Sequence, residues 1–358
     1  MVMLADLVLP PGPVLLHRGP HGIRCCFSHC TRTSPLPLPP PPLTKEVLLC
    51  CKTRYSTPSS NFSFLNEKPN AVQGPAALGL AEEEEDDDDE QDFQVVTAVR
   101  SNYNDIMILD TPKSRMLLLD STHNVHSIFN KGQKWTGSYW DEFASLPAIV
   151  PKGPIAIFGL GGGTAAHLML ELWPSLQLDG WEIDEILIDK ARDYLGLSDL
   201  EKHTQASGIL RVHVGDALSS SVNVPGGYAG IIIDLFSDGK VLPQLEEVAT
   251  WFELNDKLMP NGRLMVNCGA ANDGASNSTD TLTHPQIPSV DGTWVQNSTI
   301  KALCEAFPGQ LSWKKMPKRD GENYLALTGP LPDFTTWSAV LPDQLCSSVK
   351  QWRPCSPL

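Results

Sequence analysis

The chain has 358 residues, which is enough for one sizeable domain with additional segments, and 41% of them are hydrophobic, as in an ordinary globular protein. Its formal net charge of -15 disfavours nucleic acid as a partner, because binding phosphates requires a basic patch. No apolar stretch approaches the length of a membrane span, so a membrane is not an expected partner either.

The first 75 residues have the composition of a disordered leader. Prolines cluster between Pro35 and Pro42, serine and arginine are scattered, and acidic residues are few. Such a segment cannot bury enough apolar area to offset the entropy lost on ordering, and its composition is typical of an organelle transit peptide. We therefore expect residues 1–75 to direct the protein to the chloroplast, with the mitochondrion or the cytoplasm as alternatives. Residues 76–92 follow as a flexible acidic linker.

The cysteines are unevenly distributed, with five of the nine in the leader. Those five lack the paired spacing of a zinc site, so we expect no metal. The other four imply no disulfide framework, and a reducing compartment is the simplest expectation. These four are Cys268, Cys304, Cys346 and Cys355.

Strand-like apolar runs follow the acidic linker. They cover residues 93–99, 106–109 and 116–119, and turn-forming residues separate them. This pattern predicts a small N-terminal β subdomain of antiparallel hairpins over residues 93–150.

From residue 151 to residue 330 the chain alternates between predicted strands and helices, as in an α/β fold with a largely parallel sheet. The strands are predicted at 155–158, 176–182, 209–214, from 231 onward and at 263–267. The helices are predicted at 164–173, at 185–194 and from Leu245 to beyond Phe252, the last being ended by Pro260, Asn261 and Gly262. A polar, glycine-rich stretch over 270–292 predicts a long loop near a site, and residues 331–358 form a C-terminal tail without clear periodicity.

The first strand of this α/β region ends in a glycine cluster, with Gly159, Gly161 and Gly163 ahead of a predicted helix. Such a turn brings the backbone close to a nucleotide in an open α/β sheet. The cluster lacks the Gly-Lys-Ser/Thr ending of a Walker phosphate loop, and Thr164 takes the place of the last glycine in a nicotinamide-binding loop. It fits a loop that holds an S-adenosyl ligand better, the alternative being a tight turn that binds nothing.

Acidic residues follow the next three predicted strands, and the carboxyl ends of parallel strands meet at one edge of a sheet. Glu182 is expected to accept hydrogen bonds from two ribose hydroxyls, and Asp216, which precedes Ala217, from the adenine amino group. Asp234 and Asp238 remain for the reacting end, where a carboxylate can hold an alkylammonium and take its proton. The alternative for Asp238 is a structural turn, because Ser-Asp-Gly is a good turn sequence.

These motifs resemble those of the spermidine synthase family, over residues 101–328. The matching segments are 159–164, 181–184, 215–217, 233–238 and 258–262. The resemblance implies a Rossmann-like, seven-stranded methyltransferase-type sheet and aminopropyl transfer from decarboxylated S-adenosylmethionine to putrescine, a step of polyamine biosynthesis. It implies Glu182 as the ribose ligand, Asp216 as the adenine ligand and Asp234 as base and amine anchor, with Asp238 and Tyr139 as supporting groups. It also implies a small-molecule amine as partner and a possible homodimer.

Several departures from the family pattern leave the donor and the acceptor open. The loop lacks the aspartate that helps to select the decarboxylated donor, Asp234 and Asp238 are one residue further apart, and His126 stands near the place of an expected glutamine. Two alternatives to aminopropyl transfer are therefore kept: methyl transfer from intact S-adenosylmethionine, and a non-catalytic homologue that only binds the nucleotide. The expected co-substrate is S-adenosylmethionine or its decarboxylated form.

Overall fold

The computed structural model describes residues 93–120, 124–270, 293–317 and 323–355, which lie in one compact unit. The leader, the acidic linker and the predicted loop beyond Ala270 lie outside the described residues. Within the described ranges, every helix is too short or too polar to cross a membrane.

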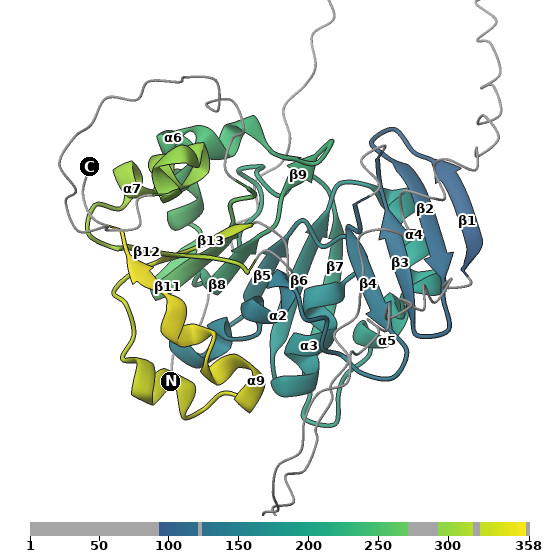
Figure 1. The fold of residues 1–358 in the computed structure, drawn as a ribbon, viewed down its shortest axis with the longest axis horizontal. Coiled ribbons are helices and arrows are strands. Elements are labelled where there is room, and N and C mark those ends of the chain that lie inside the picture. Colours follow the sequence, from purple (N-terminus) through teal and green to yellow (C-terminus); the bar gives the residue numbers. More distant parts are fainter. Residues whose placement is uncertain (1–92, 121–123, 271–292, 318–322, 356–358) are drawn as a thin grey trace, which may run out of the picture. The chain divides into compact units, whose positions relative to one another are not determined.

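A four-stranded antiparallel sheet forms the N-terminal β subdomain (Figure 1). Its strands are β1 (Gln94–Arg100), β2 (Asp105–Asp110), β3 (Ser114–Leu118) and β4 (Ser127–Asn130). Strands that follow one another in the chain pair with one another, as the hairpin pattern predicts. The sequence predicts the first three strands but not β4, because Ser127–Asn130 has only two adjacent apolar residues and shows no strand pattern.

The larger sheet has eight strands in the order β14-β12-β13-β11-β8-β5-β6-β7 (Figure 1). These strands are β5 (Ile155–Phe158), β6 (Gln177–Glu182), β7 (Ile209–Val214), β8 (Tyr228–Ile233), β11 (Leu258–Asn267), β12 (Leu311–Lys315), β13 (Tyr324–Thr328) and β14 (Arg353–Pro354). β5 pairs in parallel with β6 and β8, whereas β13 runs antiparallel to β11 and β12. The predicted α/β, Rossmann-like, methyltransferase-type fold is confirmed, with the two-residue edge strand β14 in addition to the seven predicted strands.

The strand order reverses at β5, which makes the space between β5 and β8 the topological switch point. The chain proceeds from β5 to β6 and β7 on one side, and then crosses to β8 on the other. Ligands in open α/β sheets bind at the carboxyl ends of the strands at such a point. Because Phe158 pairs with Ile233, the residues that follow them, Gly159 and Asp234, leave the sheet next to each other.

Helices cover both faces of the large sheet (Figure 1). They are α2 (Tyr139–Phe143), α3 (Thr164–Leu172), α4 (Glu185–Tyr194), α5 (Leu197–Leu200), α6 (Val248–Asn255), α7 (Ser298–Ala306), α8 (Phe334–Ser338) and α9 (Asp343–Cys346). Alternate residues of β5 enter opposite cores: Ile155 and Ile157 join the core formed with α2, α3 and α4, whereas Ala156 and Phe158 join the core formed with α6 and α7. The period of two along each strand therefore decides which helices its side chains meet.

The remaining short elements are 3-10 helices and one small hairpin. They are η1 (Leu146–Ile149), η2 (Pro243–Glu246), η4 (Thr293–Gln296), η6 (Val349–Gln351), β9 (Phe236–Ser237) and β10 (Lys240–Val241). The hairpin of β9 and β10 directly follows the carboxyl end of β8, so it borders the switch point.

The bounds predicted for the helix between Leu245 and the Pro-Asn-Gly sequence at 260–262 are wrong. Leu245 belongs to η2, α6 begins at Val248, and α6 ends at Asn255. The Pro-Asn-Gly sequence lies inside β11, where it forms an irregularity between two positions that pair with β8. Asn261 has a positive φ angle of 64°, so the turn signal is expressed locally, but the flanking residues pair with β8 and the strand continues through it.

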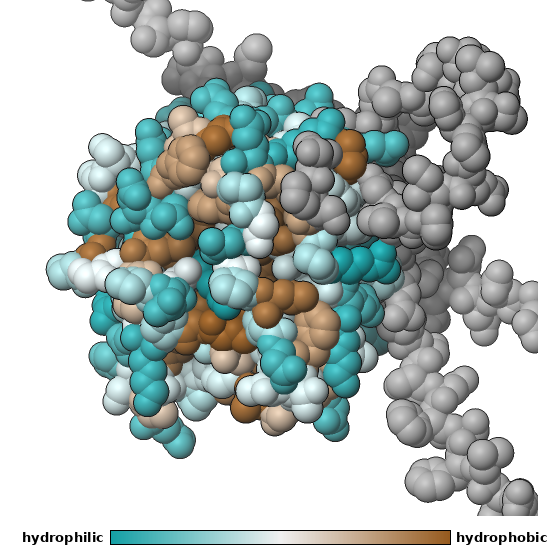
Figure 2. All heavy atoms as spheres, turned by 90° about the vertical axis from the view of Figure 1, so that its left-hand side faces the viewer, coloured by the Kyte–Doolittle hydropathy of each residue, from teal (hydrophilic) through white to brown (hydrophobic). Residues whose placement is uncertain are grey.

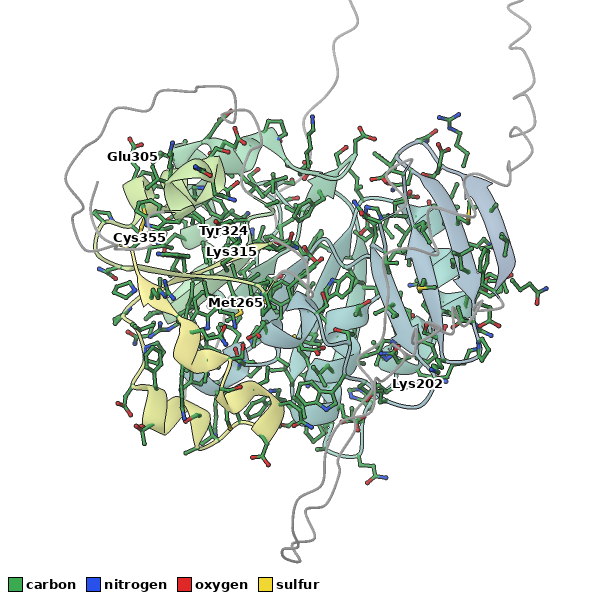
Figure 3. The ribbon with its side chains drawn as sticks, viewed as in Figure 1. Lys202, Met265, Glu305, Lys315, Tyr324 and Cys355 are labelled. Atoms are coloured by element: carbon green, nitrogen blue, oxygen red, sulfur yellow. A yellow bond between two sulfur atoms is a disulfide. The ribbon has the colours of Figure 1, made fainter. Side chains whose placement is uncertain are left out.

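The C-terminal segment (residues 331–355) returns to the large sheet. β14 pairs with β12 at the edge, and Cys355 forms a disulfide with Cys304 of α7. Figure 3 labels Cys355 on the same side of the molecule as Glu305 of α7. Figure 2 shows this side, where apolar side chains reach the surface between polar ones. The disulfide differs from the expectation of none, because cysteines 51 residues apart give no spacing signal in the sequence.

Removing this disulfide with the double variant Cys304→Ser/Cys355→Ser is expected to lower the free energy of unfolding by about 2–4 kcal/mol, because the bond restricts the unfolded chain. Guanidinium denaturation of the full chain measures this difference. Cys346→Ser is the matched control, since Cys346 is a free cysteine, and its unfolding midpoint should stay near that of the wild type. Equal midpoints for the oxidised wild type and the double variant would contradict the prediction.

Candidate active site

The predicted ligand-binding loop connects β5 to α3 and requires glycine at three positions. Gly159, Gly161 and Gly163 have φ angles of 85°, 54° and 87°, in the left-handed region where only glycine is unstrained. Gly163 is also the N-cap residue of α3. A Cβ atom at Gly159 would lie 2.2 Å from the carbonyl oxygen of Asp234, so the loop touches the end of β8 directly. The three predicted cofactor-binding glycines are thus brought together at the switch point.

The predicted ribose ligand, Glu182, lies half-buried at the end of β6 and contacts the same loop. Its Oε2 atom accepts a hydrogen bond of 3.0 Å from the backbone N–H of Gly161, and its Oε1 atom accepts from the N–H groups of Ile183 and Asp184. Burial raises the pKa of Glu182, and the three N–H groups oppose this effect. Oε2 can still accept from a ligand hydroxyl, and the neighbouring Ile183 side chain is 41% exposed, which offers an apolar surface beside it.

The other predicted ligands at this edge differ in exposure. Asp216 is exposed, and its Oδ1 atom accepts a hydrogen bond of 2.9 Å from the N–H of Leu218, which is an Asx turn. Ala217 is buried. Asp184, in contrast, has a structural role: it caps α4 and accepts hydrogen bonds from Ser101 and Asn104 of the N-terminal subdomain.

Asp238 lies away from a buried environment. It is exposed in the turn between β9 and β10, with a φ angle of 49°, and Gly239 follows it with a φ angle of 70°. Two successive residues with positive φ are typical of a tight hairpin turn with an Asp-Gly sequence. The turn alternative for Asp238 therefore describes its local structure, and its catalytic role stays a prediction.

Asp234 follows β8 and carries the densest set of polar contacts at the switch point. Its Oδ1 atom accepts a hydrogen bond of 2.9 Å from the Nδ2 atom of Asn267 in β11. The Tyr139 hydroxyl of α2 lies 3.2 Å from Oδ2 and 3.4 Å from Oδ1. Burial raises the pKa of Asp234 to about 6, although the hydrogen bonds from Asn267, Tyr139 and the Trp140 side chain favour the charged form. The predicted base and its predicted supporting tyrosine are thus in direct contact.

Aromatic rings surround this carboxylate on the α2 side. The Tyr139 ring lies 4.7 Å from the Trp140 ring and 5.8 Å from the Phe143 ring, measured between centroids. Because Tyr139 and Trp140 present their polar hydroxyl and N–H groups to Asp234, the attraction for a cationic group comes from the carboxylate itself. The arrangement therefore fits an alkylammonium better than an anionic acceptor.

The strand alternation explains why Asn267 and Asp234 meet, although the sequence analysis does not single out Asn267. Ile232 of β8 and Met265 of β11 belong to the core on the α2 side, so the residues two positions later project to that side as well. The alternation of residues along β11 could have identified Asn267, but only if the register between β8 and β11 were known. Ser127 of β4 is a second residue not foreseen, since its Oγ atom accepts a hydrogen bond of 2.8 Å from the N–H of Gly162.

His126 stands beside Ser127 and pairs with a buried acid. Its Nε2 atom lies 3.2 Å from Oδ2 of Asp120, and its Nδ1 atom accepts a hydrogen bond from the N–H of Leu119. Burial lowers the pKa of His126. Because Nδ1 accepts a hydrogen bond, the neutral ring carries its proton on Nε2, which donates a hydrogen bond to Asp120. In the part of the chain that the structure describes, no group of three His, Cys, Asp or Glu side chains could hold a metal ion.

No family model matches the chain, but individual proteins do. It is 24% identical over 216 residues to the "Probable polyamine aminopropyl transferase" of Bifidobacterium longum, covering 58% of this chain and 46% of that protein. It is 32% identical over 98 residues to the "Polyamine aminopropyltransferase" of Streptococcus uberis, covering 26% of this chain and 32% of that protein. The chain thus spans less than half the length of these two relatives.

The fold is similar to that of a solved structure, a probable spermidine synthase from Corynebacterium glutamicum. The TM-score is 0.51 at 15% sequence identity, and the similarity covers 74% of this chain and 91% of that one. This similarity concerns the fold alone. Together, the two sequence relatives and the shared methyltransferase-type fold support a likeness of this chain to the spermidine synthase-like family.

Proposed function

We propose that the chain binds an S-adenosyl donor at the β5–α3 loop and transfers an aminopropyl group to a diamine or polyamine. The observation that carries the proposal is the contact of Asp234 with both Tyr139 and the glycine loop. This contact sets a half-buried carboxylate, held by Tyr139, beside the place where the donor would lie. The names of the two relatives, both polyamine aminopropyltransferases, agree with this assignment.

In the proposed reaction, the neutral nitrogen of the acceptor attacks the aminopropyl carbon that is bonded to the donor sulfonium. The N–C bond forms as the C–S bond breaks, the electron pair of the broken bond stays on sulfur, and methylthioadenosine leaves. The acceptor arrives as an ammonium with a pKa of about 10, so it must lose a proton before it can attack. Asp234 takes this proton, and its pKa of about 6 makes it a stronger base than an exposed carboxylate.

Methyl transfer is the second candidate function, and the structure of the loop at Gly162 is compatible with it. This is the position of the family's donor-selecting aspartate. A Cβ atom at Gly162 would lie 2.4 Å from the Leu195 Cδ1 atom and 2.9 Å from the Ser127 Cβ atom, so an acidic side chain there would require Leu195 and Ser127 to shift. Intact S-adenosylmethionine then has no like charge to oppose its carboxylate at this position.

The products distinguish these candidates. The full chain is incubated with each donor and a panel of amines, and methylthioadenosine and S-adenosylhomocysteine are quantified. Methylthioadenosine that disappears in Asp234→Asn, but not in the exposed control Asp256→Asn at the end of α6, supports aminopropyl transfer. Formation of S-adenosylhomocysteine alone would contradict aminopropyl transfer and support methyl transfer instead. Donor binding by calorimetry without either product would point to the non-catalytic homologue, and no binding would refute the ligand site.

A further inference from the structure

We infer that a buried cluster of Lys314, Glu142 and Ser348, remote from the donor loop, positions the Tyr139 hydroxyl on Asp234. The cluster joins the C-terminal segment and β12 to α2, the helix that carries Tyr139. Its three members are thus assigned as positioning residues. The inference rests on the proposed function where it concerns reaction rate, but not where it concerns the titration of Asp234.

The helix α2 needs external anchors, because five residues do not form a stable helix on their own. Asp141 holds its start, where its carboxylate accepts hydrogen bonds from the N–H groups of Thr136 and Gly137 and from the Thr136 hydroxyl. Two indole N–H groups hold the carbonyl groups that follow the helix. Trp173 donates to Ala144 at 2.9 Å and Trp337 of α8 donates to Ser145 at 3.1 Å.

A further anchor is an ion pair inside the protein. The Lys314 Nζ atom lies 2.6 Å from Oε2 of Glu142, and the two side chains are only 1% and 7% exposed. The Ser348 hydroxyl bridges the pair: it accepts a hydrogen bond of 2.5 Å from Lys314 Nζ and donates to Oε1 of Glu142. The Trp352 ring lies 5.5 Å from Lys314 Nζ. The two opposite charges of this cluster therefore pair with each other, although Oε2 of Glu142 lacks the geometry of a hydrogen bond.

Such a cluster is a poor source of stability, which points to a role in placement. Desolvating two charges costs about as much as their attraction returns, and apolar side chains of similar volume often stabilise a core equally well. What an ion pair adds is direction, because it fixes where the Glu142 carboxylate must lie. Tyr139 is three positions earlier on α2 and therefore one turn away on a neighbouring part of the helix surface. The position of Glu142 thus sets the position of the Tyr139 hydroxyl.

Few charged or polar groups surround Asp234 and Glu142. Asp234 faces Tyr139 and Trp140 from α2 and Asn267 from β11. Glu142 faces Lys314 from β12 and Ser348 from the C-terminal segment, with the Asp141 carboxylate as its charged neighbour on α2. A shift of α2 would remove a hydrogen-bond donor from Asp234 without adding a charge to it. Since that donor stabilises the charged carboxylate, its loss makes Asp234 harder to ionise.

The test compares Ser348→Ala and Glu142→Gln with Tyr139→Phe in the full chain. The titration of Asp234 is followed by carbon-13 NMR of labelled aspartate, with the signal assigned from Asp234→Asn. Each of the three variants is expected to move the Asp234 midpoint upward by about 0.5–1 pH unit, which corresponds to one lost hydrogen bond. Combining Ser348→Ala with Tyr139→Phe should move it no further than Tyr139→Phe alone, because both act through the same hydroxyl.

The matched control is Ser338→Ala in the same C-terminal segment. Ser338 donates its hydroxyl within α8, to the carbonyl oxygen of Thr335, so its loss should leave the Asp234 midpoint in place. An unchanged midpoint in Ser348→Ala would overturn the inference, and so would additive shifts in the double variant. A shifted, non-additive midpoint without any methylthioadenosine would support the inference while refuting the proposed function.

Discussion

Replacing Asp234 by asparagine is expected to slow the proposed aminopropyl transfer by about 100- to 10,000-fold, the usual contribution of a positioned general base. Asparagine keeps the size of the side chain but cannot accept the ammonium proton. In the wild type the rate should rise with pH through about 6, because burial places the pKa of Asp234 there and only the ionised form is a base. Steady-state rates of methylthioadenosine release between about pH 5 and 8 measure both effects.

The same substitution is expected to change how stability depends on pH. The pKa of Asp234 is raised from 3.8 to about 6 in the folded protein, so the folded state holds the proton more tightly than the unfolded chain. Its contribution to stability is complete below about pH 4 and is lost as the pH rises through about 6. The free energy of unfolding of Asp234→Asn, relative to the wild type, should therefore rise by about 3 kcal/mol from pH 4 to pH 8. A pH-independent difference, as expected for Asp256→Asn, would contradict the assigned burial.

Replacing Lys314 by methionine is expected to lower the free energy of unfolding by about 3–5 kcal/mol. The substitution keeps most of the side-chain volume but leaves the Glu142 carboxylate buried without its cation. Burial already lowers the pKa of Lys314, and Glu142 counteracts this by favouring the charged ammonium, so each partner makes the burial of the other tolerable. Urea denaturation at neutral pH measures the loss.

The control for Lys314→Met adds a substitution of its partner Glu142. In Glu142→Leu/Lys314→Met both charges are absent, and most of the lost stability should return, since apolar replacements of buried ion pairs are often neutral. If the double variant is as unstable as Lys314→Met alone, the loss comes from packing and not from an uncompensated charge. The exposed pair of Lys202 and Asp199 offers a contrast, because breaking it should cost less than about 1 kcal/mol.

The centre of the fold could be predicted from apolar periodicity. β5 and α4 have the predicted bounds, because continuous apolar runs and a capping Asp184 mark them in the sequence. β12 gives no such signal, because Trp313 is followed by Lys314. A lysine predicts an exposed position, and its burial can be understood only once its partner Glu142 is known. Long-range pairing of this kind decides burial, and no local pattern encodes it.

The candidate site was predictable to a similar extent. Spacing alone predicts the glycines of the loop, and the structure supplies the reason in their positive φ angles. It also predicts Asp234, but the closeness of Tyr139 depends on how α2 packs, and Asn267 depends on the register between β8 and β11. The roles of Asp216, Ala217 and Asp238 stay predictions, because contacts within the chain do not say what a ligand would touch.

The contact between Gly159 and Asp234 has a consequence for redesigning this protein. Any side chain at Gly159 would press on the backbone at Asp234, since even a methyl group would approach its carbonyl oxygen to 2.2 Å. The glycine loop and the residues that follow β8 therefore meet along the backbone. A substitution at Gly159 would therefore displace Asp234, the proposed base, whereas Asn267 and α2 lie outside this backbone contact.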